Sequence, residues 1–185
     1  MSRKFLLTAT VAAAFLLGIV ATASLAAKHT VALTASDVVA HTALAPAGAT
    51  CYTVAIPLPE SIKGKELFGA YLELYLDVDA VERNGLVNET PYFDVHALES
   101  AFAGTVEEKQ FGAPAFGPRN VVRGENRRVV LDITDIVEAY LDGSAANHGL
   151  IIGSLTGDRD GVFTVKSGLL DQGAVANLIF HFRDR

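Results

Sequence analysis

Apolar and polar residues alternate along most of the chain after residue 27, and this two-residue period is typical of β-strands with one buried face. The clearest example is GAYLELYLDVDA, in which Leu72, Leu74 and Leu76 share one face and Tyr71 and Tyr75 share the other. We therefore expect these leucines to face a core and these tyrosines to face solvent. Similar alternation predicts further strands over 29–33, 35–43, 51–57, 92–98, 128–133, 150–155, 161–167 and 174–182.

About eight or nine strands separated by Gly, Pro, Asn and Asp predict an all-β fold, a jelly-roll-like antiparallel β-sandwich. The segment TDIVEAYLDG departs from the alternation, because its apolar residues follow a helical spacing. It predicts one short helix over about 134–142, with Tyr140 facing the core. Thr134 or Asp135 is expected to cap its start, and Gly143 to end it in a left-handed conformation. The Gly- and Pro-rich stretch 99–127 is expected to be a surface excursion or a pair of short strands.

The N-terminus has the three zones of a secretory signal in their usual order. A basic start precedes an apolar run over 5–20, and the small-residue stretch ATASLAA follows. Residues 1–27 are therefore predicted to be a signal peptide, cleaved near Ala23 to Ala27, and 28–185 to be a single domain that is secreted to the periplasm or the cell surface. The alternative is an uncleaved anchor, the only membrane contact we expect.

The net charge excludes some classes of binding partner, and the cysteine content excludes an internal disulfide. Removing the signal leaves 13 basic and 21 acidic residues, a net charge of −8. Nucleic acids and anionic membrane surfaces require clustered Lys and Arg, so both are excluded as expected partners. The single cysteine, Cys51, rules out an internal disulfide and is expected to be buried as a small apolar residue.

The segment VVLDITDIVEAYLDGSAANHGLIIGSL (129–155) resembles the DNRLRE-type β-sandwich domain, which is related to disaggregatase-related repeats and to some carbohydrate-binding modules. The resemblance implies a jelly-roll-like sandwich of an extracellular protein, often joined to polysaccharide-active enzymes or surface proteins. This chain has Tyr140 where the family usually has Trp. The residues that carry the resemblance are Leu131, Asp132, Thr134, Val137, Tyr140, Gly143, Asn147, Gly149 and Leu150.

No enzyme is expected, because the chain contains no HExxH, GxSxG, CxxC or P-loop motif. The acidic stretch DVDAVERNG offers Asp77, Asp79 and Glu82 as oxygen ligands for a structural Ca²⁺. It does not fit an EF-hand loop, since Val81 falls where a ligand oxygen is required, and we prefer a solvated loop after a strand. We expect no other cofactor.

Two sets of residues are candidates for ligand binding. Tyr71 and Tyr75 lie on one face of their strand, about 13 Å apart at about 3.3 Å per residue, and aromatic faces stack on sugar rings. Arg123 and Arg127 belong to a basic cluster that could grip carboxylated sugars through bidentate contacts. For each set, the alternative is an ordinary structural role: cross-strand packing for the tyrosines and a solvated rim for the arginines.

These features predict a secreted, non-catalytic module that binds an extracellular polysaccharide or another surface component, such as a cell-surface protein. The alternative is a structural or assembly protein of the cell envelope or extracellular matrix, in which strand edges pair between chains and the protein self-associates.

Overall fold

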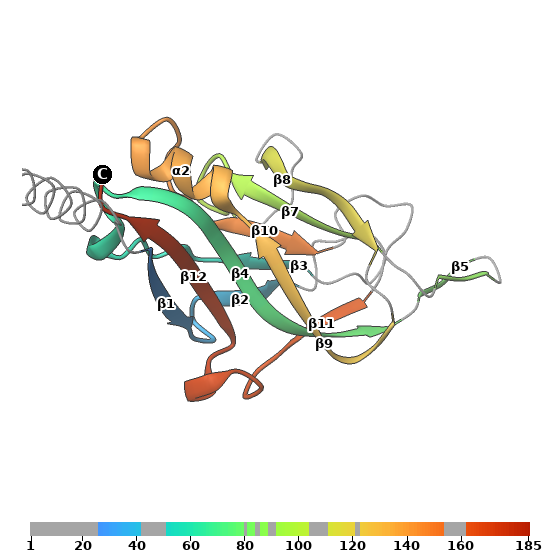
Figure 1. The fold of residues 1–185 in the computed structure, drawn as a ribbon. Coiled ribbons are helices and arrows are strands. Elements are labelled where there is room, and N and C mark those ends of the chain that lie inside the picture. Colours follow the sequence, from blue (N-terminus) through green and yellow to red (C-terminus); the bar gives the residue numbers. More distant parts are fainter. Residues whose placement is uncertain are drawn as a thin grey trace, which may run out of the picture.

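The computed structural model describes residues 26–41, 51–79, 81–83, 86–88, 92–103, 111–120, 123–153 and 162–185. Two antiparallel sheets pack face to face, which makes the protein an all-β sandwich (Figure 1). Sheet A contains β1 (Ala27–Leu33), β4 (Glu66–Asp79), β9 (Gly124–Asp132), β11 (Val162–Lys166) and β12 (Ala176–Arg183). Sheet B contains β2 (Val38–His41), β3 (Cys51–Val54), β7 (Tyr92–Leu98), β8 (Phe111–Asn120) and β10 (Leu150–Gly153).

The strand order is that of a jelly roll, as expected from the sequence. In sheet A the first strand lies beside the last, in the order β1-β12-β4-β9, and sheet B has the order β2-β3-β10-β7-β8. The chain crosses repeatedly between the sheets, so most strands that neighbour each other in one sheet are distant in sequence; β2 with β3 and β7 with β8 are the exceptions among the described strands of these two sheets. β11 and β12 pair one after the other with the same side of β4, and the segment 167–175 between them contains the 3₁₀ turn η4 (Asp171–Gly173).

β4 supplies the centre of the core, and its alternation is as predicted. Leu72, Leu74 and Leu76 are fully buried, whereas Tyr71 and Tyr75 are half-buried on the opposite face. Neighbouring strands extend the apolar layer, since Leu72 lies opposite Leu131 on β9 and Leu178 on β12, both buried. Sheet B closes the other side with the buried side chains of Val54, Val95, Leu150 and Ile152.

Two strand regions differ from the sequence prediction. β8 is a ten-residue strand within the stretch that was expected to be irregular or to hold two short strands. Pro114 and Pro118 concealed it, yet prolines are tolerated in a strand at the border of a sheet, and β8 has β7 as its one partner among the described strands. The acidic stretch is also not a loop, because Asp77 and Asp79 lie within β4 and are followed by a hairpin of β5 (Val81–Arg83) and β6 (Leu86–Asn88).

The predicted helix is confirmed as α2 (Thr134–Asp142), the one α-helix among the residues that the structure describes, and it lies across one end of the sandwich (Figure 1). Ile136, Val137 and Tyr140 are buried, and Gly143 ends the helix with φ 79°. The expected cap was wrong. Neither Thr134 nor Asp135 caps the helix; instead Asp132 Oδ1 accepts the Thr134 N–H at 3.1 Å, and Thr134 Oγ1 accepts the Ala70 N–H from β4 at 3.0 Å.

A turn between α2 and β10 ties the helix to sheet B and to the segment after β3. The hydroxyl of Tyr140 donates to the carbonyl of Gly149 at 3.0 Å, and Leu98 N–H donates to the same oxygen. Asn147 donates to the carbonyl of Ile56 at 2.8 Å and accepts the Gly149 N–H at 3.2 Å. These bonds give a folding role to the residues on which the family resemblance rests.

The described ranges contain no helix of the length and apolarity that a bilayer crossing requires. The predicted signal segment, residues 1–27, lies outside the described residues apart from its last two positions, 26 and 27.

We predict that Tyr140 contributes through its ring and through its hydroxyl, and that two variants separate these contributions. Tyr140→Ala should lower the free energy of unfolding by about 3 kcal/mol or more, because it leaves a cavity under the helix. Tyr140→Phe should cost about 1 kcal/mol, since it removes only the hydrogen bond to Gly149. Urea unfolding followed by circular dichroism measures both values. A loss below about 0.5 kcal/mol for the alanine variant would contradict this placement of the ring.

We predict that two glycines with left-handed backbones differ in their tolerance of a side chain. Gly143 has φ 79° and no atom within 4 Å of an added Cβ, so Gly143→Ala should cost about 1 kcal/mol. Gly149 has φ 86°, and its Cβ would lie 2.5 Å from the carbonyl oxygen of Val54. Gly149→Ala should therefore cost about 3 kcal/mol or more in the same unfolding assay. Equal losses at the two positions would show that the close approach to Val54 is not a constraint.

Candidate functional site: the outer face of sheet A

The face of sheet A that points away from the core carries the predicted tyrosines. Because strand neighbours share a face, this surface runs from Thr30 and Ala32 on β1, through β12 and β4, to Arg128 and Val130 on β9. Val130 is 41% exposed, and nothing in the described chain packs over it. We call this surface the outer face of sheet A.

Tyr71 is part of an aromatic row and is not paired with Tyr75. Its ring turns back along the strand over Gly69, where an added Cβ would lie 2.8 Å from Tyr71 Cε2. The ring of His181, on β12 directly opposite Gly69, meets Tyr71 edge-on at a centroid distance of 5.8 Å and an angle of 76°. His181 also contacts Phe68, at a centroid distance of 6.1 Å and an angle of 43°, and Phe68 is 49% exposed. We call Phe68, His181 and Tyr71 the aromatic row.

A β-bulge creates this row. The register of β4 and β12 shifts between His181 and Phe182, so that Gly69 pairs with His181, Leu67 pairs with Phe182, and Phe68 is the extra residue. Phe68 is thereby displaced to the solvent side. Sequence reasoning missed Phe68 and His181, although a glycine after two adjacent apolar residues in an alternating strand is a recognised signal of a bulge.

A fixed polar group lies beside the aromatic row. Glu73, between Tyr71 and Tyr75 on β4, is only 9% exposed although it lies on the outer face. The guanidinium of Arg128 donates to Glu73 Oε1 from both Nε and Nη2 at 2.6 Å, and Asn177 Nδ2 donates to Oε2 at 3.4 Å. A nearly buried carboxylate is stable only with such partners. Arg128 itself remains 59% exposed, so it offers donors to a ligand in a set position.

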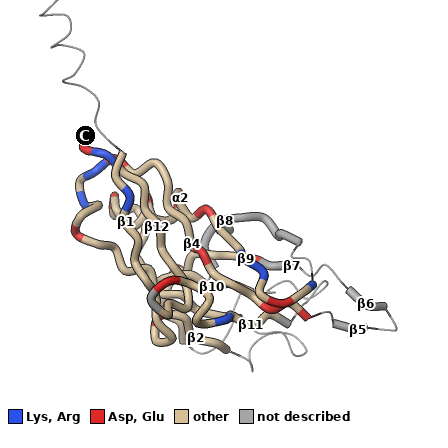
Figure 2. Tube along the Cα trace, turned by 60° about the horizontal axis from the view of Figure 1, so that its bottom comes forward, with Lys and Arg blue, Asp and Glu red and all other residues tan. Residues whose placement is uncertain are grey.

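Tyr75 lies at the other end of this polar group. It pairs with Arg128 on β9 and with Lys166 on β11, so its neighbours are charged and not aromatic. Lys166 Nζ lies 2.6 Å from Asp77 Oδ2, and the backbone N–H of Asn126 donates to Asp77 Oδ1 at 2.8 Å. Acidic and basic positions are thus interspersed along this part of sheet A (Figure 2).

The predicted calcium ligands are only partly described. Asp77 and Asp79 lie two residues apart on one side of β4, Asp79 is exposed, and Asp77 already has a cation beside it in Lys166. Glu82 belongs to β5, and its side chain lies outside the described part of the chain. Among the described residues no group of three His, Cys, Asp or Glu side chains has the arrangement of a metal site.

The predicted arginines do not join the tyrosines. Arg127 pairs with Leu76, a core-facing residue, so Arg127 and Arg128 emerge from opposite faces of β9. The guanidinium of Arg127 folds over Gly124 and donates from Nη2 to the carbonyl of Arg123 at 3.1 Å. Arg123 and Arg127 are therefore adjacent and exposed, but one guanidinium N–H of Arg127 already donates to the backbone of Arg123.

Part of the outer face of sheet B is buried. Cys51, Leu98 and Ile151 form a second buried cluster, with Phe102 packed against it, and the burial of Cys51 is as predicted. Burial raises the pKa of the Cys51 thiol and lowers the pKa of His41, whose ring is tilted by 49° against Phe102 at a centroid distance of 4.4 Å. Both shifts favour uncharged forms, and a neutral, buried thiol is a poor nucleophile.

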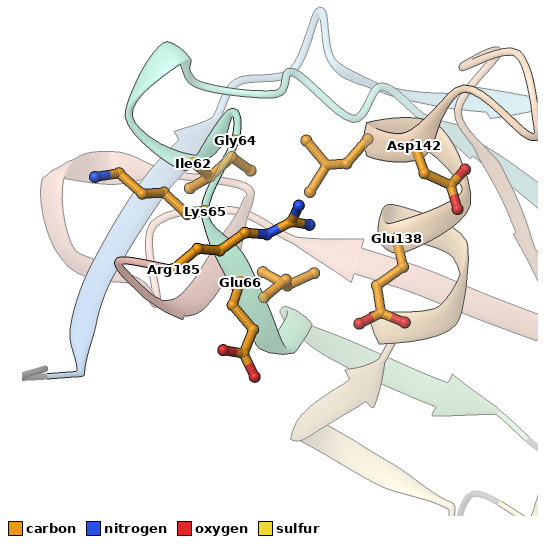
Figure 3. A pocket seen from close by; sticks show the side chains of 9 residues that line it. Ile62, Gly64, Lys65, Glu66, Glu138, Asp142 and Arg185 are labelled. Atoms are coloured by element: carbon orange, nitrogen blue, oxygen red, sulfur yellow. The ribbon is translucent and has the colours of Figure 1, made fainter.

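A pocket of about 370 Å³ lies beside α2 at one end of the sandwich (Figure 3). Ile62, at the end of the 3₁₀ turn η2 (Glu60–Ile62), together with Leu67 and Leu141 gives it an apolar lining. Its charged residues have both signs, and the side chain of Arg185 points across it toward α2. None of the residues predicted from the sequence to bind a ligand lines it.

Searches against protein-family models and against curated proteins find no match to this chain. The fold and the outer face define the class of the protein as a jelly-roll β-sandwich with aromatic and charged side chains on the outer face of one sheet.

We predict that Lys166 controls the protonation of Asp77. The ammonium of Lys166, with a smaller effect from the Asn126 N–H, holds the pKa of Asp77 below its usual value. A lowered folded-state pKa stabilises the fold above the ordinary aspartate range, and that contribution is lost as the pH falls through the lowered pKa. Lys166→Met should raise the Asp77 pKa in an NMR titration of the side-chain carboxyl. Lys63→Met, which removes a separate pair with Glu60, should leave it unchanged. No movement in the Lys166 variant would disprove the pairing.

Proposed function

We propose that this protein is an exported, non-catalytic module that binds an extracellular polysaccharide through the outer face of sheet A. The observation that carries the proposal is the aromatic row, in which Phe68 is 49% exposed, next to the ion-paired group of Glu73, Arg128 and Asn177. Aromatic faces attract the C–H surface of a sugar ring, and fixed charged and amide groups bond its hydroxyls.

The exposure of the site along its strands favours a polymer over a small ligand. A pocket that suits a small molecule encloses most of its surface, whereas the outer face of sheet A is open along its strands. From Phe68 to Tyr75 the face extends along seven residues of β4, or roughly 23 Å at about 3.3 Å per residue. A chain of several sugars can contact the row at one end and Arg128 or Tyr75 at the other.

The charges favour a neutral glycan over a uronic acid. Arg128 and Lys166 already neutralise Glu73 and Asp77, so the face has little surplus positive charge. The arginines that were predicted to grip carboxylated sugars, Arg123 and Arg127, lie apart from the aromatic row. Export rests on the N-terminal signal pattern, and the DNRLRE-type resemblance of residues 129–155 supports the same extracellular role.

A second candidate function is a structural subunit of the cell envelope or matrix. The observation that favours it is the exposed border of sheet A at β1, where another chain can add a strand. This candidate predicts self-association, and it does not require any glycan.

We predict that Phe68→Ala weakens retention on immobilised neutral glycans at least tenfold, because it removes the most exposed ring of the row. Val39→Ala is the matched control: Val39 is 42% exposed but lies on sheet B, and its loss should leave retention unchanged. Affinity electrophoresis in gels that contain each glycan measures the retention. An additional Arg123→Ala and Arg127→Ala double variant tests the uronic-acid alternative. If acidic glycans retain the protein and only this double variant abolishes that retention, the site is at the arginines. If the protein is folded and no glycan retains it, the proposal is disproved.

A further inference from the structure

Sheet edges expose unpaired N–H and C=O groups, and natural proteins usually protect them. β8 borders sheet B with two prolines and three register shifts against β7, and β2 at the opposite border has only four residues. β9 borders sheet A with a register shift and a positive φ of 52° at Asn126. β11 has five residues and pairs directly with β4, on the same side as β12. It is therefore one strand closer to the centre of sheet A than β1, which pairs with β12. Each of these borders is short, interrupted or recessed.

β1 is different. Its seven residues pair with β12 without any register shift, and the sequence AKHTVAL contains neither Gly nor Pro. Among the described residues, the backbone of 27–32 pairs with β12 alone. The strand lies at the border of sheet A, with β12 between it and β4 (Figure 1). It therefore presents a straight and regular edge to which another strand can be added.

We infer that β1 is a dimerisation edge, on which a second copy of this chain adds its own β1 antiparallel to the first. In the register centred on Thr30, residues 28–32 of one copy pair with residues 32–28 of the other, so that Thr30 lies opposite Thr30; all five residues follow the predicted signal peptide. Lys28, the strand's one lysine, then lies opposite Ala32, so no like charges face each other. The pairing is isologous: each copy contributes the same strand, and the β1 edge of both copies is then paired. Assembly through β1 therefore stops at two copies, in contrast to the open-ended assembly of a filament.

The dimer would place two outer faces on the same side of one continuous sheet, because the twofold axis of an antiparallel strand pair is perpendicular to the sheet. The order β4-β12-β1 followed by its mirror in the second copy contains five strand spacings. At about 4.8 Å each, the two β4 strands lie about 24 Å apart. This consequence rests on the proposed function: two sites on one polymer bind with an avidity that one site lacks.

The test uses the full chain, expressed in an exporting host and recovered from the exported fraction. Thr30 is exposed, so its replacement should not disturb the core. Thr30→Lys and Thr30→Glu each place like charges opposite one another at the centre of the pairing. In sedimentation velocity at about 1–100 μM, we expect the unaltered protein to be a dimer, each variant to dissociate at least tenfold more readily, and an equimolar mixture of the two variants to dimerise again.

Thr164→Lys is the control, because Thr164 is exposed on the outer face of sheet A but belongs to β11, and it should leave the dimer intact. A monomer at every concentration, a dimer that both Thr30 variants leave unchanged, or growth into filaments would each overturn the inference. Glycan retention is measured on the same samples, and, because Thr30 lies on the outer face of sheet A, the Thr30→Lys monomer is compared with the mixed dimer of the two variants, which should be retained at least tenfold more. A dimer without any retention would leave β1 as the interface and remove only the polysaccharide function.

Discussion

The central constraint in this protein is the two-sided pairing of β4. β12 and β11 occupy one side of the strand, and β9 occupies the other. A strand held on both sides cannot slip by one residue without exchanging its two faces, because side chains alternate with a period of two. Burial of Leu72, Leu74 and Leu76 therefore fixes the register, and the same choice forces Tyr71, Glu73 and Tyr75 to the outer face. The core and the candidate site are two consequences of one pairing.

A nearly buried carboxylate on an outer face needs a physical reason. Glu73 is enclosed by the side chains of its own sheet and not by another layer, and its charge is tolerated because Arg128 and Asn177 satisfy its oxygens. Burying an ion pair gains little stability, since desolvation offsets much of the attraction. What the pair does provide is position: an exposed guanidinium held in one place beside the aromatic row can bond a ligand without first losing its own freedom.

Much of the fold could be predicted from the sequence, because the spacing of apolar residues within a short segment indicates whether that segment forms a strand or a helix. The alternation of GAYLELYLDVDA and the helical spacing of TDIVEAYLDG depend on which residues are apolar, and both correspond to elements of the structure. β8 was hidden because Pro114 and Pro118 suppress the usual strand signal, and their tolerance depends on a border position that only the tertiary fold defines. The hairpin of β5 and β6 had a local signal, the Asn84-Gly85 pair between two short apolar runs, which was overlooked.

The site was less predictable than the fold, since its members meet only through strand pairing. Tyr71 could be placed on an outer face from alternation alone, but its partner His181 lies on a strand more than a hundred residues later, and Phe68 faces solvent only because of the bulge. The predicted partnership of Tyr71 with Tyr75 assumed that rings project straight from the strand. In the structure the absence of a side chain at Gly69 leaves a bare strip of backbone, and Tyr71 gains contact by covering it. The missing side chain at Gly69 thus leaves room for the Tyr71 ring beside His181 and away from Tyr75, which makes one compact aromatic row in place of two separate rings.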